Sequence, residues 1–298
     1  MRARPPMLLT AAIAVVMVLV AGYEAKVYGA PAGDSVKRPM TLASPLVRAI
    51  MPNAAFGGLP ARIQRATEEA ADDGATISVA VLDRATHQMV SNGNVEIIAT
   101  ASVAKLFIAD DLLLQESQGK IKLSPEDRQS LDLMLRSSDD DAAEKFWNQG
   151  GGDAIIAQVA GRYGLTSTAP PSDGRWWNTI SSVPDLIRYY DMLLDGSGGL
   201  PPERAGVIVS NLAQSTPTGI DGYPQRFGIP DGLYAEPVAV KQGWMCCIGD
   251  DWMHLSTGVV GADRRYVMVI QSLQPSDDAT ARAVITRAVK TIFPIGRI

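Results

Sequence analysis

The sequence predicts an α/β fold of the α+β kind, in which an antiparallel sheet flanked by helices carries an inserted all-helical lobe. Apolar residues alternate along 76–83, which is the period of a β-strand. Three further apolar, strand-like segments, 238–245, 255–260 and 266–273, lie near the other end of the chain. The region between them, roughly 105–213, has the start signals of several helices. Strands from both ends around a helical insertion predict two lobes, with a site in the cleft between them.

The remaining elements follow from composition, turns and caps. Residues 61–73 are rich in Ala, Arg, Gln and Glu, which favours a helix. Residues 88–91 are expected to pair back on the first strand, and 92–93 is an Asn-Gly turn signal. Ser124 and Ser182 each precede a proline by one or two residues, which is typical of a capped helix start. Two later helices are expected at 202–212 and 277–292.

The N-terminus indicates export from the cytoplasm. Two arginines precede the apolar segment 7–21, and small residues follow at 30–32, which is the layout of a signal peptide. Residues 1–32 are therefore expected to be a signal peptide or, as the alternative, an uncleaved N-terminal membrane anchor. No cysteine lies near the end of the apolar run, which disfavours a lipid-anchored lipoprotein, and no Arg-Arg pair indicates the twin-arginine route. Residues 33–60 are expected to be a linker, and 61–298 the folded domain.

Charge and residue counts exclude several classes of function. The net charge is −5 without a basic run, so nucleic acid is not expected as a partner. The chain has two histidines, His87 and His254, and two cysteines, Cys246 and Cys247. His87 is far from the other three along the chain, so no metal site and no cofactor are expected. Scarce histidine also disfavours a Ser-His-Asp triad and leaves lysine as the expected base. The cysteines could be free thiols or a vicinal disulfide, favoured equally, or could link to another chain.

Two Ser-x-x-Lys motifs occur, and their surroundings distinguish them. Ser102 and Lys105 are followed by the apolar run 106–109; on a helix, both side chains would lie on one face, one turn apart. A serine hydroxyl becomes a nucleophile when a base takes its proton, and a lysine whose charge is suppressed can do this. Ser117 and Lys120 lie in a polar, glycine-containing stretch that is typical of a solvated helix end. We therefore expect the nucleophile at Ser102.

Two further motifs follow in order. Ser138-Asp-Asp140 lies between two expected helices, where by itself it would be read as a helix cap. Lys241-Gln-Gly243 lies on the strand after the helical insertion, where a single lysine could simply guard a sheet edge. The combination and order of the three motifs are more specific than any one of them.

On these motifs, residues 61–298 resemble the serine β-lactamase and penicillin-binding protein superfamily, in its class A-like branch. The resemblance implies a β-lactamase-like two-lobe fold. It implies that Ser102 is the acylated nucleophile and Lys105 its base. It also implies that Ser138 relays a proton to the leaving nitrogen, and that Lys241 acts on the substrate carboxylate and on this relay.

The substrate-binding positions implied by the resemblance include two departures from the family. Asp140 stands where the family usually has asparagine, and an ionised carboxylate can only accept hydrogen bonds. Gln242 stands where a threonine or serine usually helps to hold the substrate carboxylate. Gly243 and Trp244 complete the implied site, with the N–H groups of Ser102 and Trp244 as the oxyanion hole.

A third departure concerns release of the acyl group. Class A β-lactamases use a glutamate to activate the hydrolytic water, but the matching loop, 170–178, has no glutamate, and Asp173 has a different spacing. The resemblance thus implies an exported serine acyl-enzyme that acts on, or is acylated by, peptidoglycan-like peptides or β-lactams. The alternatives are a true β-lactamase with a non-standard deacylating group, and an inactive member that binds cell-wall peptide or a protein partner. If the N-terminal apolar segment stays uncleaved as an anchor, membrane association through it is expected.

Overall fold

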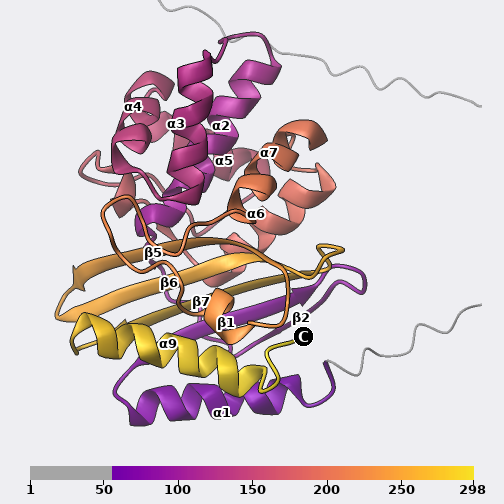
Figure 1. Cartoon of the computed structure of the whole chain (residues 1–298), viewed down its shortest axis with the longest axis vertical. Helices are drawn as coiled ribbons and strands as arrows, with labels where there is room; N and C mark the ends of the chain where they lie inside the picture. Colours follow the sequence, from indigo (N-terminus) through magenta and orange to yellow (C-terminus); the bar gives the residue numbers. More distant parts are fainter. Residues whose placement is uncertain (1–55) are drawn as a thin grey trace, which may run out of the picture. The chain divides into compact units, whose positions relative to one another are not determined.

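The described part of the chain is built around a five-stranded antiparallel sheet. The computed structural model describes residues 56–298 of the chain, all within the compact unit Ile50–Ile298. The strand order is β2-β1-β7-β6-β5, and every neighbouring pair is antiparallel (Figure 1). The predicted antiparallel sheet is therefore confirmed. The strands are β1 (Thr76–Asp83), β2 (Gln88–Ser91), β5 (Val238–Ile248), β6 (Asp251–Val260) and β7 (Tyr266–Gln274).

The sheet is covered on both faces, which explains why its central strands are so apolar. In β1, Val79 and Val81 face one hydrophobic core, whereas Ala80 and Leu82 face the other. The central strand β7 is buried along its whole length. Successive side chains of a strand point to opposite faces, so a strand that is covered on both sides needs apolar residues at nearly every position.

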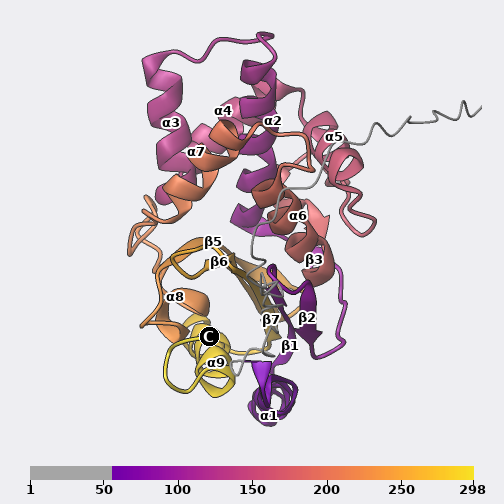
Figure 2. The same cartoon turned by 90° about the vertical axis from the view of Figure 1, so that its right-hand side faces the viewer.

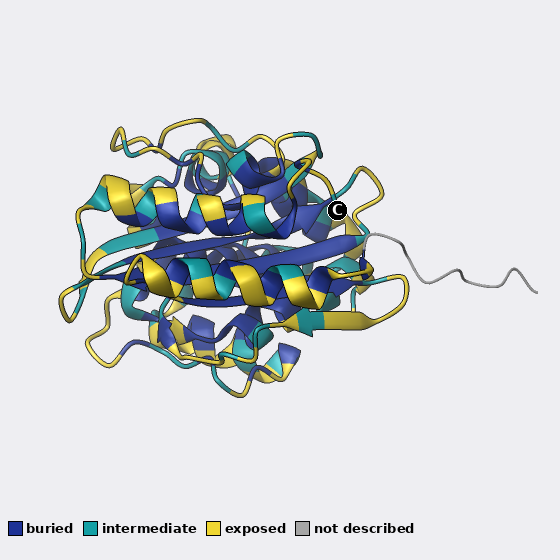
Figure 3. Cartoon of the chain, turned by 90° about the horizontal axis from the view of Figure 1, so that it is seen from below, coloured by how far each residue is buried: buried dark blue, intermediate teal, exposed yellow. Residues whose placement is uncertain are grey.

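Helices α1 (Leu59–Asp72) and α9 (Asp278–Ile292) cover one face of the sheet side by side (Figures 1 and 2). Seen from outside, each presents exposed residues to solvent and buried residues to the sheet (Figure 3). The buried stripe of α1 consists of Leu59, Ile63, Ala66 and Ala70, at the spacing of one helix face. The short helix α8 (Ile229–Gly232) packs beside α9.

The opposite face carries the helical lobe. Its central helix, α2, is apolar over most of its surface because other helices surround it (Figure 1). The start signals predicted from the sequence are confirmed: the Ser124 side chain accepts from the N–H of Asp127 in a capping box, and Ser182 accepts from the N–H of Asp185. The helices are α2 (Lys105–Ser117), α3 (Pro125–Arg136), α4 (Asp140–Gly150), α5 (Asp153–Tyr163), α6 (Val183–Asp195) and α7 (Pro202–Leu212).

Four short elements near the site were not predicted. A two-stranded sheet joins β3 (Ile98–Ala99) to β4 (Ile180–Ser181). A 3₁₀ turn, η2 (Ala101–Ala104), precedes α2, and a second, η3 (Trp176–Asn178), lies beside it. Such pieces are too short to give a periodic pattern in the sequence.

The sequence expectations for the N-terminus fall almost entirely outside the described residues. The predicted signal peptide or anchor, 1–32, lies outside them, as does most of the predicted linker, 33–60. Helix α1 begins at Leu59, so the last two residues of the predicted linker are helical. Within 56–298, no helix has the length and apolar character needed to cross a membrane.

Candidate active site

Ser102 lies in the 3₁₀ turn η2, directly before α2, rather than inside a regular α-helix. Thr100 fixes the turn from one side, since its hydroxyl donates to the carbonyl of Thr179 at 2.9 Å. Ala101 has a φ of 46°, a left-handed conformation that costs a non-glycine residue energy and often marks a functional site. The deeply buried helix α2 follows and holds the serine in place. The Ser102 side chain is therefore presented by a rigid and locally strained turn.

Lys105 is completely buried, and its ammonium nitrogen is the centre of the site. Its Nζ lies 2.8 Å from Oγ of Ser102 and 2.7 Å from the carbonyl oxygen of Ser138. It also lies 2.5 Å from Oδ1 of Asp140. The indole of Trp176 lies against the same group, with 4.7 Å between Nζ and the ring centroid. Ser102 and Lys105 are thus within hydrogen-bonding distance, as their three-residue spacing predicted.

Ser138 and Lys241 reach the same point from two other elements. Ser138 stands between α3 and α4 with a φ of 57°, another left-handed non-glycine residue. Nζ of Lys241, on β5, lies 2.8 Å from Oγ of Ser138, and Nζ of Lys105 lies 3.2 Å from the same oxygen. The four catalytic side chains implied by the resemblance therefore form one connected hydrogen-bonded group.

Burial acts on both lysines in the direction that general-base chemistry requires. Removal from water lowers the pKa of Lys105, although the Asp140 carboxylate works against this effect. Burial also lowers the pKa of Lys241 to well below its ordinary value, and the neighbouring Lys105 pushes it further down. Two buried amines of depressed pKa beside two hydroxyls form a group that can take up and pass on protons.

The substrate positions implied by the resemblance do not all reach the site. Gly243 is required where β5 passes η2, because a Cβ there would lie 2.5 Å from the carbonyl oxygen of Thr100. Trp244 follows it and lines a pocket at Ser102. Gln242, however, is buried on the other side of β5, where its amide group donates to the carbonyls of Gln225 and Phe227. The alternation of side chains along the strand sends Gln242 away from the face that carries Lys241.

The pocket at Ser102 has a volume of about 240 Å³. Its walls include Asp140, which was expected, and Asp221, which was not. Asp221 stands in a loop between α7 and α8, and no motif or periodicity marks it in the sequence. Of the tryptophan pair 176–177, Trp176 is buried and Trp177 half-buried, yet both line the pocket. The full lining is Ala101, Ser102, Asp140, Trp176, Trp177, Asp221, Trp244 and Met245.

The second Ser-x-x-Lys motif has no comparable geometry. The Ser117 hydroxyl donates to the carbonyl of Leu114 within its own helix. Lys120 is exposed and follows Gly119, whose left-handed φ of 69° turns the chain after the helix end. This copy is a helix terminus, as its polar surroundings predicted.

The cysteines and histidines are placed apart from the reacting groups. Cys246 and Cys247 form a vicinal disulfide, so of the alternatives that the sequence left open the structure has this one. Both are exposed on β5, next to the pocket residue Met245. His254 is buried on β6, where its Nε2 lies 2.8 Å from the Tyr223 hydroxyl. Across 56–298, no group of three or more His, Cys, Asp or Glu residues is placed to hold a metal ion.

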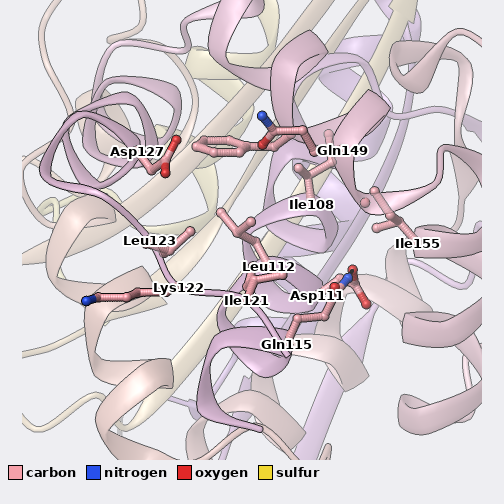
Figure 4. Close-up of a pocket in the computed structure, with 12 residues that line it drawn as sticks. Ile108, Asp111, Leu112, Gln115, Ile121, Lys122, Leu123, Asp127, Gln149 and Ile155 are labelled. Atoms are coloured by element: carbon pink, nitrogen blue, oxygen red, sulfur yellow. Dashed lines mark hydrogen bonds between the residues drawn. The ribbon is translucent and has the colours of Figure 1, made fainter. Parts of the chain in front are cut away.

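A second pocket, of about 260 Å³, lies within the helical lobe. Apolar side chains of α2 and of the loop after it surround this pocket, and Asp111 lies beside Gln115 at its edge (Figure 4). The Asp111 carboxylate accepts a hydrogen bond from the Gln115 amide at 2.6 Å. None of the four reacting residues lines this pocket.

Comparison with known proteins gives close relatives by sequence. No protein-family model matches the chain. The chain is 70% identical over 314 aligned residues to the Mycobacterium tuberculosis protein named "Putative lipoprotein LppW", and the match covers all of both chains. The Mycobacterium bovis protein of the same name matches equally well. The chain belongs to the LppW family. The name of these relatives describes a lipoprotein and states no reaction.

Solved structures show the fold of this LppW-family chain at much lower sequence identity. A β-lactamase from Chitinophaga pinensis is 16% identical with a TM-score of 0.63, covering 78% of this chain and 98% of the other. PBP-A is 18% identical with a TM-score of 0.64, covering 80% and 95%. A variant of PBP-A, solved as its acyl-enzyme with penicillin G, is 17% identical with a TM-score of 0.65, covering 80% and 96%. The β-lactamase-like fold predicted from the sequence is therefore confirmed.

Proposed function

We propose that this protein is an exported serine acyl-enzyme of the penicillin-binding type, which acts on peptidoglycan-like peptides and is acylated by β-lactams at Ser102. The observation that carries the proposal is the 2.8 Å distance between Nζ of Lys105 and Oγ of Ser102, at a pocket in a β-lactamase-like fold. The acyl-enzyme formed by the PBP-A variant with penicillin G supports the same chemistry on the same fold.

The acylation step uses the four connected side chains. Lys105, in its neutral form, takes the proton of the Ser102 hydroxyl while Oγ bonds to the carbonyl carbon of the substrate. The carbon–nitrogen bond of the amide or lactam then breaks, and the leaving nitrogen takes a proton from the Ser138 hydroxyl. The proton that Lys105 took from Ser102 then passes to Ser138, whose Oγ lies 3.2 Å from Nζ of Lys105. Lys241 holds the Ser138 hydroxyl in place through a hydrogen bond of 2.8 Å. The product is an ester of Ser102 and a free amine.

Slow release of the acyl group is part of the proposal. The loop 170–178 carries no glutamate, and its carboxylate, Asp173, accepts hydrogen bonds from the N–H of Arg175 and the amide of Asn178 in the same loop. A carboxylate that is occupied in this way is poorly placed to activate water for hydrolysis. This favours a long-lived ester over the turnover of a true β-lactamase.

A second candidate function is binding without acylation, and one contact favours it. Asp140 lies 2.5 Å from Nζ of Lys105 and stabilises the charged form of the lysine, which cannot accept a proton. If this ion pair dominates, the protein binds cell-wall peptide or a protein partner at the same pocket and does not form the ester.

A location in the cell envelope is proposed from two sources. The N-terminal segment has the layout of a signal peptide, and the LppW relatives are named as lipoproteins. The two cysteines of this chain form a disulfide in β5, more than two hundred residues further along the sequence than the apolar N-terminal run, so an anchor of this protein would be the apolar segment itself.

The test is to incubate the purified protein with a fluorescent penicillin and to follow its intact mass over time, with Ser102→Ala as the control. A lasting adduct on the wild-type protein alone supports the acyl-enzyme, and rapid loss of the adduct indicates a β-lactamase. The absence of an adduct under any condition supports the binding function instead.

A further inference from the structure

The walls of the pocket at Ser102 are acidic, which the acylation chemistry does not require. Asp140 and Asp221 both line the pocket. The charge of Asp140 is balanced by Lys105 at 2.5 Å. Asp221 is exposed, and its carboxylate accepts a hydrogen bond from the N–H of Tyr223 at 3.0 Å. Within residues 56–298, no lysine, arginine or histidine forms an ion pair with Asp221, although its charge favours the charged forms of the buried Lys105 and Lys241.

The cations near the pocket do not offset this charge. The residues that line it include no lysine, arginine or histidine. Lys241 does not line the pocket and is buried, and burial favours its neutral form. Arg175 lies against the ring of Trp177, with 5.9 Å between its guanidinium carbon and the ring centroid, and it also pairs with Asp173 at 3.8 Å. A ligand that enters the pocket therefore meets the Asp221 carboxylate and no positively charged residue among those that line the pocket.

The rest of the wall is aromatic. Trp176, Trp177 and Trp244 line the pocket, with the thioether of Met245 beside them. Trp244 is supported from behind by a parallel stack on Tyr223, with ring centroids 4.4 Å apart and an interplanar angle of 6°. Indole faces attract cations, and Trp176 already has a cation, Lys105, against its ring. Aromatic walls with an unpaired carboxylate are the usual chemistry of a site for an organic cation.

We propose that this pocket selects substrates that carry an ammonium or guanidinium group, with Asp221 as the counter-ion and Trp244 as the aromatic wall. This names the substrate class of the same site and so rests on the proposed function. The pocket, at about 240 Å³, is smaller than the ~300 Å³ at the low end of whole-ligand sites, so it suits one basic side chain of a larger peptide. A substrate with a second carboxylate at this position is disfavoured by the same charge.

The test measures binding in the absence of acylation. A negative result therefore counts against the cation preference and not against the proposed acyl-enzyme function. Ser102→Ala protein is titrated with Nα-acetyl-Lys-D-Ala-D-Ala and with the same peptide acetylated on its side-chain amine, with tryptophan fluorescence as the readout. The peptide with the free ammonium is expected to bind about fivefold more tightly at low salt, which is the effect of one unit charge at ~4 Å in a water-exposed site. The difference should shrink as salt is added.

Two variants assign the effect to the carboxylate. Asp221→Asn, made in the Ser102→Ala protein, keeps the acceptor for the N–H of Tyr223 and should abolish the preference between the peptides. Asp195→Asn is the matched control, because Asp195 is also exposed and also accepts the N–H two residues further on, from Ser197, but lies outside the pocket. The control should keep the preference. Equal affinity for the two peptides, tighter binding of the acetylated one, or no binding of the ammonium peptide would overturn the proposal, even if penicillin acylates Ser102 in the wild-type protein.

Discussion

The carboxylate of Asp140 lies 2.5 Å from Nζ of Lys105, the same nitrogen that lies 2.8 Å from the hydroxyl of Ser102. The two contacts favour different protonation states of the lysine. The ion pair with Asp140 is strongest when the amine is charged, whereas proton transfer from Ser102 needs the amine neutral. Burial lowers the pKa of Lys105 and favours the neutral form, so the balance between burial and Asp140 sets how often the base is available.

Replacement of Asp140 by asparagine should speed acylation. Asp140→Asn removes the charge that raises the pKa of Lys105 and leaves burial, which lowers it. More of the lysine is then neutral at pH 7, and the rise of the acylation rate with pH should move to lower pH. A tenfold gain at pH 7 corresponds to a shift of about one pKa unit. The measurement is the rate of adduct formation with a fluorescent penicillin between pH 5 and 9.

Asp141→Asn is the matched control, since Asp141 is the next residue of the same helix turn, is exposed, and makes no contact with Lys105. It should leave the rate and its pH dependence unchanged. A slower rate in Asp140→Asn, or an equal gain in both variants, would contradict the view that the ion pair restrains the base.

Lys241→Met should slow acylation without lowering the free energy of unfolding. The amine of Lys241 is buried and donates to the Ser138 hydroxyl at 2.8 Å. Methionine keeps the volume but cannot form the hydrogen bond that holds the proton-donating hydroxyl of Ser138, so acylation should fall ~100-fold, the usual size of a general acid–base contribution. The free energy of unfolding should not fall, because a buried amine is itself costly. Lys290 is an exposed lysine of α9, and Lys290→Ala should change neither the acylation rate nor the free energy of unfolding. If Lys241→Met lowers the free energy of unfolding enough to account for its lower rate, the role of Lys241 is structural.

The pair Asp83–Arg265 is expected to stabilise the sheet in a pH-dependent way. Asp83 is buried and accepts two hydrogen bonds from the Arg265 guanidinium, at 2.8 and 2.6 Å, which hold its pKa below the ordinary value. Because the folded pKa is the lower one, this stabilisation is present above the unfolded pKa of ~4 and is lost as the pH falls through the folded pKa.

Asp83→Asn should therefore lower the free energy of unfolding by about 2 kcal/mol at pH 7, because it leaves the guanidinium without its charged partner. The gap to wild type should narrow as the pH is lowered towards 3. Urea unfolding at pH 7 and pH 3 measures both values, with the exposed Asp72→Asn of α1 as the control. A gap that is unchanged between the two pH values would show that the charge of Asp83 does not stabilise the fold.

The disulfide between Cys246 and Cys247 predicts a simple thiol count. Unfolded but unreduced protein should take up no iodoacetamide, and reduced protein should take up two groups, because all cysteines of the chain are in this bond. Intact mass reports both numbers. Both cysteines are exposed, so a reductant should reach them in the folded protein as well. Modification of the unreduced protein would mean that the thiols are free.

The sequence predicts well those parts of the molecule that depend on local pattern. Alternation along 76–83 predicted β1 with its observed bounds, and the serine–proline starts predicted α3 and α6. The order of the three motifs along the chain predicts a common site, and their lysine and serine side chains lie within hydrogen-bonding distance of one another in the structure. Caps and periodicity are set by a few neighbouring residues, which a single sequence contains in full.

What the sequence did not reveal depends on long-range packing. Asp221 reaches the pocket through a loop that has no pattern of its own. Gln242 could be assigned to a face only once the orientation of β5 was known. The sequence alone suggests that Asp110 lies on a solvated face or forms a local ion pair, but Asp110 is buried and accepts hydrogen bonds from the distant Arg162 and Tyr163. In each case folding brings together residues that are at least fifteen positions apart, and one sequence contains no record of such contacts.

The central claim, that Ser102 is the acylated residue, is tested most directly by locating a penicillin adduct on the chain. After incubation with penicillin and digestion with trypsin, Ser102 falls in the peptide 85–105, Ser138 in 137–145, and Ser117 of the second Ser-x-x-Lys motif in 106–120. The added mass is expected on the peptide 85–105, and it should disappear in Ser102→Ala but persist in Ser117→Ala. An adduct on another peptide, or one that survives in Ser102→Ala, would contradict it.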